Sequence, residues 1–246
     1  MVCDGAAIRE RLIVWSLLIL LGGCARISEV ASLTSSPHPP QTKLQPGVHK
    51  LGLSEGRDGL LFIPVALKEG KPAPLIVALH GAGQDAREME RIIPFAEEKG
   101  IVLLIPESRG STWDFVHDSS GADFQFIDKA MTFTFDHCLV DPKRTALSGF
   151  SDGASYALSL GLVNDRLFRH LMAFSPGFLS ISKRLGNSRI FISHGTKDRI
   201  LPFEQTSEII ISTLTKWGYE VRFRQFEGGH TMSSKVIAEA FDWFLN

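Results

Sequence analysis

The chain has 246 residues, of which 44% are hydrophobic and 22% are charged, and its formal net charge at pH 7 is −1. This is the composition of a globular protein, long enough to bury a core without disulfides or metals to staple it. The sequence has no basic cluster interleaved with aromatic residues, which argues against nucleic acid as a partner.

The first segment has the pattern of an export signal. An apolar run over 12–21 follows two arginines and is too short to span a bilayer. The run ends in Leu-Gly-Gly-Cys, which resembles the lipobox of bacterial lipoproteins. That resemblance implies a signal peptide over 1–23 and an acylated Cys24 that anchors an exported protein to a membrane, on the periplasmic or extracellular side. Because Asp4 and Glu10 offset the two arginines, a plain secretory signal or an uncleaved anchor stays open.

The next segment, residues 24–50, is polar and contains several prolines, among them those of the stretch Ser-Ser-Pro-His-Pro-Pro-Gln over 35–41. Few of its side chains are apolar enough to contribute to a core. We therefore expect 24–50 to be a flexible tether and 51–246 to be a single α/β domain.

The rest of the chain alternates between short apolar runs and longer amphipathic stretches. The apolar runs predict strands over 60–65, 75–79, 101–105, 145–149, 171–174, 189–193 and 220–226. Helices are predicted between and after them, over 85–99, 123–137, 153–163, 203–217 and 233–245. The first strand contains Pro64, which cannot donate to a neighbouring strand, so we expect this strand at a sheet edge. The alternation predicts βαβ units in a mostly parallel sheet.

Polar motifs follow five of these strands, where parallel sheets bind their ligands. In chain order they are His-Gly-Ala-Gly-Gln (80–84), Pro-Glu-Ser-Arg-Gly-Ser-Thr-Trp (106–113), Gly-Phe-Ser-Asp-Gly (149–153), His-Gly-Thr-Lys-Asp (194–198) and Glu-Gly-Gly-His (227–230). A Gly-x-Ser-x-Gly motif alone is weak evidence, because glycine and serine are common in turns. The last three motifs, however, place Ser151, Asp198 and His230 at the same edge of the sheet.

With these motifs, residues 58–246 resemble the α/β-hydrolases, in particular their small lidless esterases. That branch includes phospholipase/carboxylesterases, acyl-protein thioesterases, and polyhydroxybutyrate-depolymerase-like and feruloyl-esterase-like enzymes. The resemblance implies an α/β-hydrolase fold, with a mostly parallel central sheet, helices on both faces and no large lid domain. It also implies a serine hydrolase that cleaves small or surface-presented carboxylic esters through an acyl-enzyme, without a cofactor.

The resemblance also assigns roles to particular residues. It implies that Ser151 is the nucleophile, His230 the base and then the acid, and Asp198 the carboxylate that orients the imidazole. The backbone N–H groups of Ala82 and Asp152 would form the oxyanion hole. These residue types suit the chemistry, because a serine hydroxyl is a weak nucleophile until a neighbouring base removes its proton.

The roles of several other residues in these motifs stay open. Gly81 and Gly83 would let the backbone come close to a substrate and so border the pocket. Trp113 either lines that pocket or packs in the core beside a salt-bridged Arg109. For His80 a structural hydrogen-bonding role is favoured over catalysis. The Asp152 side chain is expected to be solvated or to act as a favourable charge at a helix start.

Metal chemistry is not expected. The spacing of His117, Asp118 and Asp123 matches no familiar ligand pattern. Cys138, the only cysteine of the expected domain, has apolar neighbours and is predicted to be a buried, inert thiol.

Three alternatives to an esterase remain. A thioesterase or a peptidase uses the same three residues, because a fold does not determine the leaving group. A non-catalytic binding protein on this fold and a structural envelope lipoprotein are the others.

Overall fold

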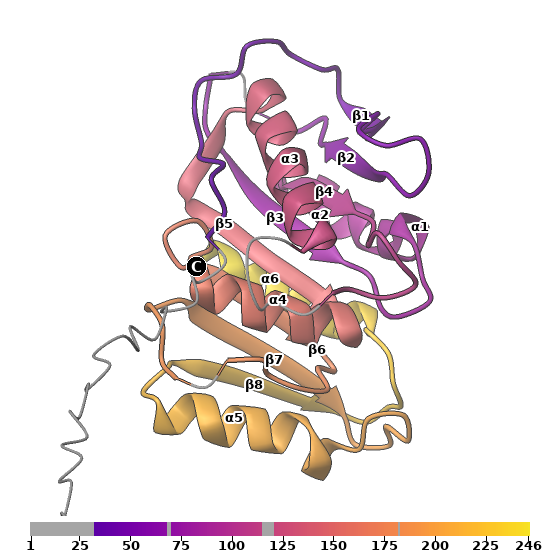
Figure 1. Ribbon diagram of the computed structural model, residues 1–246, viewed down its shortest axis with the longest axis vertical. Coiled ribbons are helices and arrows are strands. Elements are labelled where there is room, and N and C mark those ends of the chain that lie inside the picture. Colours follow the sequence, from indigo (N-terminus) through magenta and orange to yellow (C-terminus); the bar gives the residue numbers. More distant parts are fainter. Residues whose placement is uncertain (1–31, 68–69, 115–120, 182) are drawn as a thin grey trace, which may run out of the picture.

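The computed structural model describes residues 32–67, 70–114, 121–181 and 183–246 (Figure 1). Its described residues form an eight-stranded sheet in the order β1-β2-β4-β3-β5-β6-β7-β8. The strands from β3 to β8 are parallel, whereas β1 and β2 run antiparallel to their neighbours. The strands are β1 (Gly47–Lys50), β2 (Gly59–Ile63), β3 (Ala73–Leu79), β4 (Val102–Pro106), β5 (Val140–Phe150), β6 (His170–Phe174), β7 (Arg189–Gly195) and β8 (Val221–Phe226).

Helices cover both faces of this sheet. They are α1 (Ala86–Met89), α2 (Ile93–Lys99), α3 (Ala122–His137), α4 (Asp152–Val163), α5 (Ser207–Lys216) and α6 (Ser234–Leu245), with short 3₁₀ turns η1 (Glu90–Ile92) and η2 (Phe203–Gln205). In Figure 1, α3, α4 and α5 lie in front of the sheet and α6 lies behind it. The buried apolar residues accordingly form two clusters, one under α3, α4 and α5 and one under α1, α2 and α6.

Strands β3 and β4 are apolar along their whole length because both of their faces are covered. Every residue of β3, β4 and β6 is buried. An uninterrupted apolar run is the expected pattern for such a strand. The predicted fold class, a mostly parallel sheet between two helical layers, is confirmed, and the described residues contain no large lid domain.

The helix expected over 85–99 is interrupted. It is divided into α1, η1 and α2, and Pro94 stands in the first turn of α2. Proline is tolerated there because the first N–H groups of a helix have no intrahelical acceptor. The same helix ends at Gly100, whose φ of 66° lies in the left-handed region that glycine adopts without strain.

The expectation of a flexible tether over 24–50 is wrong for residues 32–50. The last four, β1, pair with β2, so β1 rather than the Pro64-bearing strand is the edge of the sheet. Upstream, Thr34 and Ser35 donate to the carboxylate of Asp128 on α3, with distances from 2.6 to 3.2 Å. The domain therefore begins before residue 51. The polar composition misled because hydrogen bonds to α3 and pairing with β2 hold this segment, and Leu33 and Leu44 add apolar contacts with the core.

The expected signal peptide over 1–23 and Cys24 lie outside the described residues. Within the described part of the chain, no helix combines the length and the hydropathy needed to cross a membrane.

Candidate active site

A sharp turn between β5 and α4 carries Ser151. This serine has φ 56° and ψ −118°, a conformation that residues other than glycine rarely adopt. Its backbone N–H donates to the carbonyl oxygen of Phe174 at 2.9 Å, which ties the turn to the end of β6. The strand thus ends and the helix begins within one residue, and the serine side chain projects from the carboxyl edge of the sheet.

Two glycines make this turn sterically allowed. A Cβ atom on Gly149 would lie 2.2 Å from the carbonyl oxygen of Gly153. A Cβ atom on Gly153 would lie 2.3 Å from the carbonyl oxygen of His80, at the end of β3. Helix α4 therefore starts so close to β5 and β3 that neither position has room for a side chain.

The three predicted residues lie in direct contact. His230, in the loop after β8, places Nε2 at 2.8 Å from Ser151 Oγ and Nδ1 at 2.6 Å from Asp198 Oδ2. Asp198 follows β7, so three strand ends supply one chain of hydrogen bonds. Because a carboxylate accepts, the imidazole carries its proton on Nδ1, and Nε2 is left to accept the proton of the serine hydroxyl.

The carboxylate of Asp198 is fully buried, and both of its oxygens accept hydrogen bonds. Oδ1 accepts the backbone N–H groups of Ile200 and Leu201, both at 2.9 Å. Burial by itself raises the pKa of Asp198, but the N–H of Leu201 and the imidazole of His230 outweigh it, so the pKa lies below its usual value. The side chain is thus held in one orientation and kept ionised.

A second histidine contacts the same carboxylate and was not singled out from the sequence. His194 Nε2 lies 3.2 Å from Asp198 Oδ2 and 2.7 Å from the carbonyl oxygen of Leu201. Its Nδ1 lies 2.7 Å from the hydroxyl of Ser207, which donates to it. Burial lowers the pKa of His194. Its place four residues before Asp198, in the same motif, is the signal that could have identified it.

The two predicted oxyanion donors lie in the turns after β5 and after β3. Asp152 is the first residue of α4, so its N–H has no acceptor inside the helix. After β3, the N–H of Gly81 donates to the Gln84 side chain at 2.9 Å and that of Gly83 donates to the carbonyl oxygen of Ser111 at 2.6 Å. In the described part of the chain, the N–H of Ala82 has no such partner, and Ala82 is exposed.

Trp113 packs in the core. Its side chain is buried, its ring makes tilted contacts with those of His80 and Tyr156, and its Nε1 donates to the carbonyl oxygen of His80 at 2.8 Å. The Asp152 carboxylate stands at a helix start but is not merely solvated. It accepts the backbone N–H of Trp113 at 3.2 Å and the hydroxyl of Thr112. Gly83 is exposed at the turn with φ 73°, in the region that favours glycine, whereas Gly81 is buried.

His80 has the structural role that the sequence favoured. It is fully buried, and its Nδ1 lies 2.8 Å from the carbonyl oxygen of Gly81. Its Nε2 accepts the backbone N–H of Ser108 and a guanidinium N–H of Arg57, both at 3.1 Å. Burial lowers the pKa of His80. Arg57, which nothing in the sequence marked, thereby joins the loop after β4 to the turn after β3.

Arg109 binds backbone rather than a carboxylate side chain. Its guanidinium donates to the carbonyl oxygens of Arg57 and Glu107 and lies 3.5 Å from the ring centre of Phe126. The expected ion pair is therefore replaced by hydrogen bonds to main-chain oxygens and a cation–π contact.

Of the three residues considered as metal ligands, one accepts hydrogen bonds from the backbone and two lie outside the described residues. Asp123 accepts the backbone N–H groups of Arg109 and Asp114, and His117 and Asp118 fall outside the described residues. No group of three or more His, Cys, Asp or Glu side chains that could hold a metal ion occurs among the residues that the structure describes.

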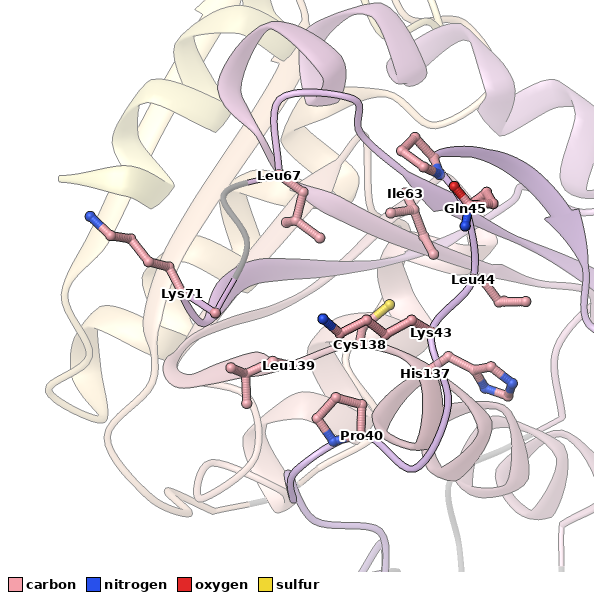
Figure 2. Close-up of a pocket in the computed structure, with 12 residues that line it drawn as sticks. Pro40, Lys43, Leu44, Gln45, Ile63, Leu67, Lys71, His137, Cys138 and Leu139 are labelled. Carbon is pink, nitrogen blue, oxygen red and sulfur yellow. The ribbon is translucent and has the colours of Figure 1, made fainter.

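The partly apolar hollow drawn in Figure 2 lies elsewhere. It measures about 400 Å³ and lies where β3 and β5 begin, at the amino edge of the sheet. Figure 2 shows Leu67, Leu139 and Cys138 among the side chains around it. None of the residues of the hydrogen-bonded chain lines this hollow. Burial raises the pKa of the Cys138 thiol to about 12, in agreement with the inert role expected for it.

The sheet order, the strained serine turn and the histidine–aspartate pair at the carboxyl edge define a protein of the α/β-hydrolase fold. Comparison with protein families narrows this class. The profile of the phospholipase/carboxylesterase family matches residues 106–245. The chain belongs to that family.

The similarity of the chain to individual curated proteins is low. The chain is 27% identical over 173 residues to feruloyl esterase C of Emericella nidulans, an alignment that covers 67% of this chain and 62% of the relative. A probable feruloyl esterase C of Aspergillus niger is 26% identical, with 66% and 62% covered. The chain therefore spans less than two thirds of the length of these curated relatives.

Solved structures share the fold. The fluorophosphonate-binding serine hydrolase F of Staphylococcus aureus superposes with a TM-score of 0.64 at 15% identity, over 82% of this chain and all of that one. A ferulic acid esterase of Anaeromyces mucronatus, solved with ferulic acid, gives a TM-score of 0.61 at 20% identity, over 85% and 94%.

Proposed function

We propose that the protein is a serine hydrolase that cleaves carboxylic esters through an acyl-enzyme. The observation that carries this proposal is the continuous chain from Ser151 Oγ through His230 to Asp198, with contacts of 2.8 and 2.6 Å. A nucleophile, a base and an orienting carboxylate in this order are the components that acyl transfer requires.

In the first half of the reaction, Ser151 Oγ attacks the ester carbonyl carbon while His230 Nε2 takes the hydroxyl proton. Asp198 keeps the other ring proton on Nδ1 and stabilises the imidazolium that forms. The carbonyl oxygen becomes an oxyanion, which the N–H groups of Ala82 and Asp152 would bind. The imidazolium then protonates the leaving alkoxide, and the alcohol departs.

In the second half, water replaces the alcohol. His230 Nε2 takes a proton from water, whose oxygen attacks the acyl carbon, and a second oxyanion forms. Its collapse breaks the bond to Ser151 Oγ, which recovers its proton from His230, and a carboxylic acid is released. These steps use only side chains, two backbone N–H groups and water.

Esters with an aromatic acyl group are the first substrates to test. Both curated relatives are named as feruloyl esterases, and the serine is partly exposed at the sheet edge, which suits a surface-presented ester. Thioesters and peptides share the same chemistry, because the fold does not determine the leaving group.

The decisive experiment is labelling with a fluorophosphonate probe, compared between the wild-type protein and Ser151→Ala. We expect covalent labelling of the wild type alone. A panel of p-nitrophenyl, feruloyl and hydroxybutyrate esters, an acyl thioester and a peptide anilide then ranks the substrates. Wild-type protein that is folded but neither labels nor hydrolyses any of them would contradict the proposal and favour a binding protein.

We also propose that the protein is exported and anchored through an acylated Cys24. The support is the Leu-Gly-Gly-Cys pattern after the apolar run. In addition, the first described residues reach the domain at Asn164, where Leu33 N donates to its side chain at 2.7 Å. Asn164 follows α4 at the end opposite Ser151, so the described chain begins away from the candidate site. Mass spectrometry of protein made in a bacterial host tests this; an unmodified N-terminus at another residue would exclude it.

A further inference from the structure

A short segment of the loop after β4, Ser111–Trp113, links the two turns that flank the nucleophile. We call it the bridge. On one side, the carbonyl oxygen of Ser111 accepts the N–H of Gly83 at 2.6 Å. The indole Nε1 of Trp113 donates to the carbonyl oxygen of His80 at 2.8 Å. The bridge therefore holds the turn that contains Ala82 at both of its ends.

On its other side the bridge holds the start of α4. Oδ2 of Asp152 accepts the backbone N–H of Trp113 at 3.2 Å and the hydroxyl of Thr112. Asp152 is also the residue whose own N–H is the second proposed oxyanion donor. One side chain thus connects the backbone of one donor to the segment that fixes the other.

A carboxylate is a costly group at this position. Negative charge develops on the substrate oxygen beside the N–H of Asp152, and a nearby anion opposes it. The proposed reaction assigns no step to this carboxylate. Its presence is understandable if the hydrogen bonds that it accepts contribute more, by placing the donors, than its charge costs.

The bridge is itself anchored on both sides. Trp113 is 5% exposed and packs between the rings of His80 and Tyr156, with centroids at 4.9 and 5.5 Å. The Tyr156 hydroxyl donates to Asp114 at 3.0 Å, and Asp114 and Asp123 each accept the other's backbone N–H, at 2.9 and 2.7 Å. The bridge and the residue after it are therefore attached to both α3 and α4.

We propose that Asp152 and Trp113 are positioning residues that, through the bridge, fix the separation of the N–H groups of Ala82 and Asp152. This inference rests on the proposed function. Donors placed for the oxyanion bind the transition state better than the ground-state ester. Loosening the bridge therefore lowers kcat and weakens transition-state analogues, while KM stays nearly constant.

The test measures kcat and KM on p-nitrophenyl acetate, the inhibition constant of an arylboronic acid, and the melting temperature. Asp152→Ala should lower kcat about tenfold, because a misplaced donor costs less than a deleted one, for which about 10²–10³ is typical. The boronate inhibition constant should rise by a similar factor, with KM within about twofold. Asp152→Asn should recover most of the loss, because its amide oxygen can accept both hydrogen bonds.

A matched control is Asp128 on α3, which makes no hydrogen bond to the bridge in the described part of the chain. Asp128 also accepts a threonine hydroxyl and backbone N–H groups, from Thr34 and Ser35. Asp128→Ala should lower the melting temperature and leave kcat and boronate affinity unchanged, which separates positioning from general loss of stability.

Thr112→Val and Trp113→Phe extend the test, since each removes one donor of the bridge. If Asp152→Ala does not fold, these two variants test the inference in its place. Each should lower kcat while KM stays nearly constant. Wild-type kcat in Asp152→Ala, or in both of these variants, overturns the inference. So does an equal loss in Asp152→Asn and Asp152→Ala, because charge would then matter and not the hydrogen bonds. Wild-type protein that folds but neither labels nor hydrolyses esters refutes the proposed function itself, and this inference with it.

Discussion

The two edges of the central sheet each carry a residue with a nucleophilic atom, and the two are opposite in environment. At the carboxyl edge, Ser151 Oγ lies 2.8 Å from an imidazole nitrogen and is partly exposed. At the amino edge, Cys138 borders a hollow of about 400 Å³, and burial raises the pKa of its thiol to about 12. The intrinsically more nucleophilic group is therefore the inert one.

The difference teaches that neighbouring groups, and not cavity size, locate the chemistry. A hydroxyl becomes a nucleophile when a base contacts it, whereas a desolvated thiol keeps its proton. The parallel strands explain where each environment arises. Polar loops follow their carboxyl ends and bring His230 and Asp198 to Ser151. The amino edge is bordered by apolar side chains such as Leu139 and Ile63.

The largest predicted effect tests this comparison directly. Ser151→Ala should lower kcat by roughly 10⁵–10⁶-fold, leaving only what binding and the oxyanion hole supply. Its stability should change by no more than about 1 kcal/mol, because one oxygen is lost from a partly exposed turn. Cys138→Ser should leave kcat unchanged. Steady-state rates on p-nitrophenyl acetate and melting temperatures measure both; near wild-type turnover in Ser151→Ala would refute the assignment.

The second prediction concerns the carboxylate behind the base. Asp198→Asn should lower kcat by about 10³–10⁴-fold, because an amide favours the wrong imidazole tautomer. The fold should persist, since the amide oxygen can still accept the N–H groups of Ile200 and Leu201. Kinetics and circular dichroism check this pair of outcomes. Near-normal turnover would mean that another carboxylate orients His230.

The third prediction concerns the tight start of α4. Gly149→Ala should destabilise the fold by about 1–3 kcal/mol, because its Cβ would lie 2.2 Å from a carbonyl oxygen. Activity should fall together with stability, since the serine turn must shift. Gly56→Ala is the matched control, because a Cβ atom there has no neighbour within 4 Å. Equal melting temperatures for the two variants would contradict this account of the turn.

The fourth prediction concerns the N-terminal part of the domain. A chain that starts at Leu51 should melt lower than one that starts at Ser32, because β2 loses its partner β1 and Leu33 and Leu44 leave the core. Molecules that remain folded should keep their kcat, since no residue of the candidate site lies in 32–50. Identical melting curves would restore the interpretation of this segment as a tether.

The smallest predicted effect is a pH dependence at Asp128. Burial raises its pKa, but hydrogen bonds from Thr34 and Ser35 outweigh this, so the pKa lies below the usual value. The contribution to stability is therefore present above the unfolded-state pKa of about 3.9 and is lost as pH falls through the folded-state pKa. The difference in melting temperature between wild type and Asp128→Asn should shrink as pH falls below about 4. A difference that grows on acidification would contradict the assigned contacts.

The sequence by itself determined the sheet and the three residues of the hydrogen-bonded chain. Apolar runs such as 75–79 and 101–105 predicted buried parallel strands, and β3 and β4 occupy nearly those residues. The serine, aspartate and histidine were predictable because each closely follows a strand and the motifs around them resemble those of the α/β-hydrolases. Both signals are local, since strand hydropathy and position at a strand end are written in a few consecutive residues.

Only the tertiary structure decided the placement of 32–50, the contact of His194 with Asp198, and the use of the Asp152 carboxylate. The first and the last depend on a partner distant in sequence, because Thr34 meets Asp128 and Trp113 meets Asp152. The contact of His194 with Asp198, four residues away, depends on how the turn after β7 folds back. A polar side chain looks the same in sequence whether it is solvated or bound. Hydrogen bonds between separate elements leave no periodic trace along the chain, and so they emerge only when the fold brings their partners together.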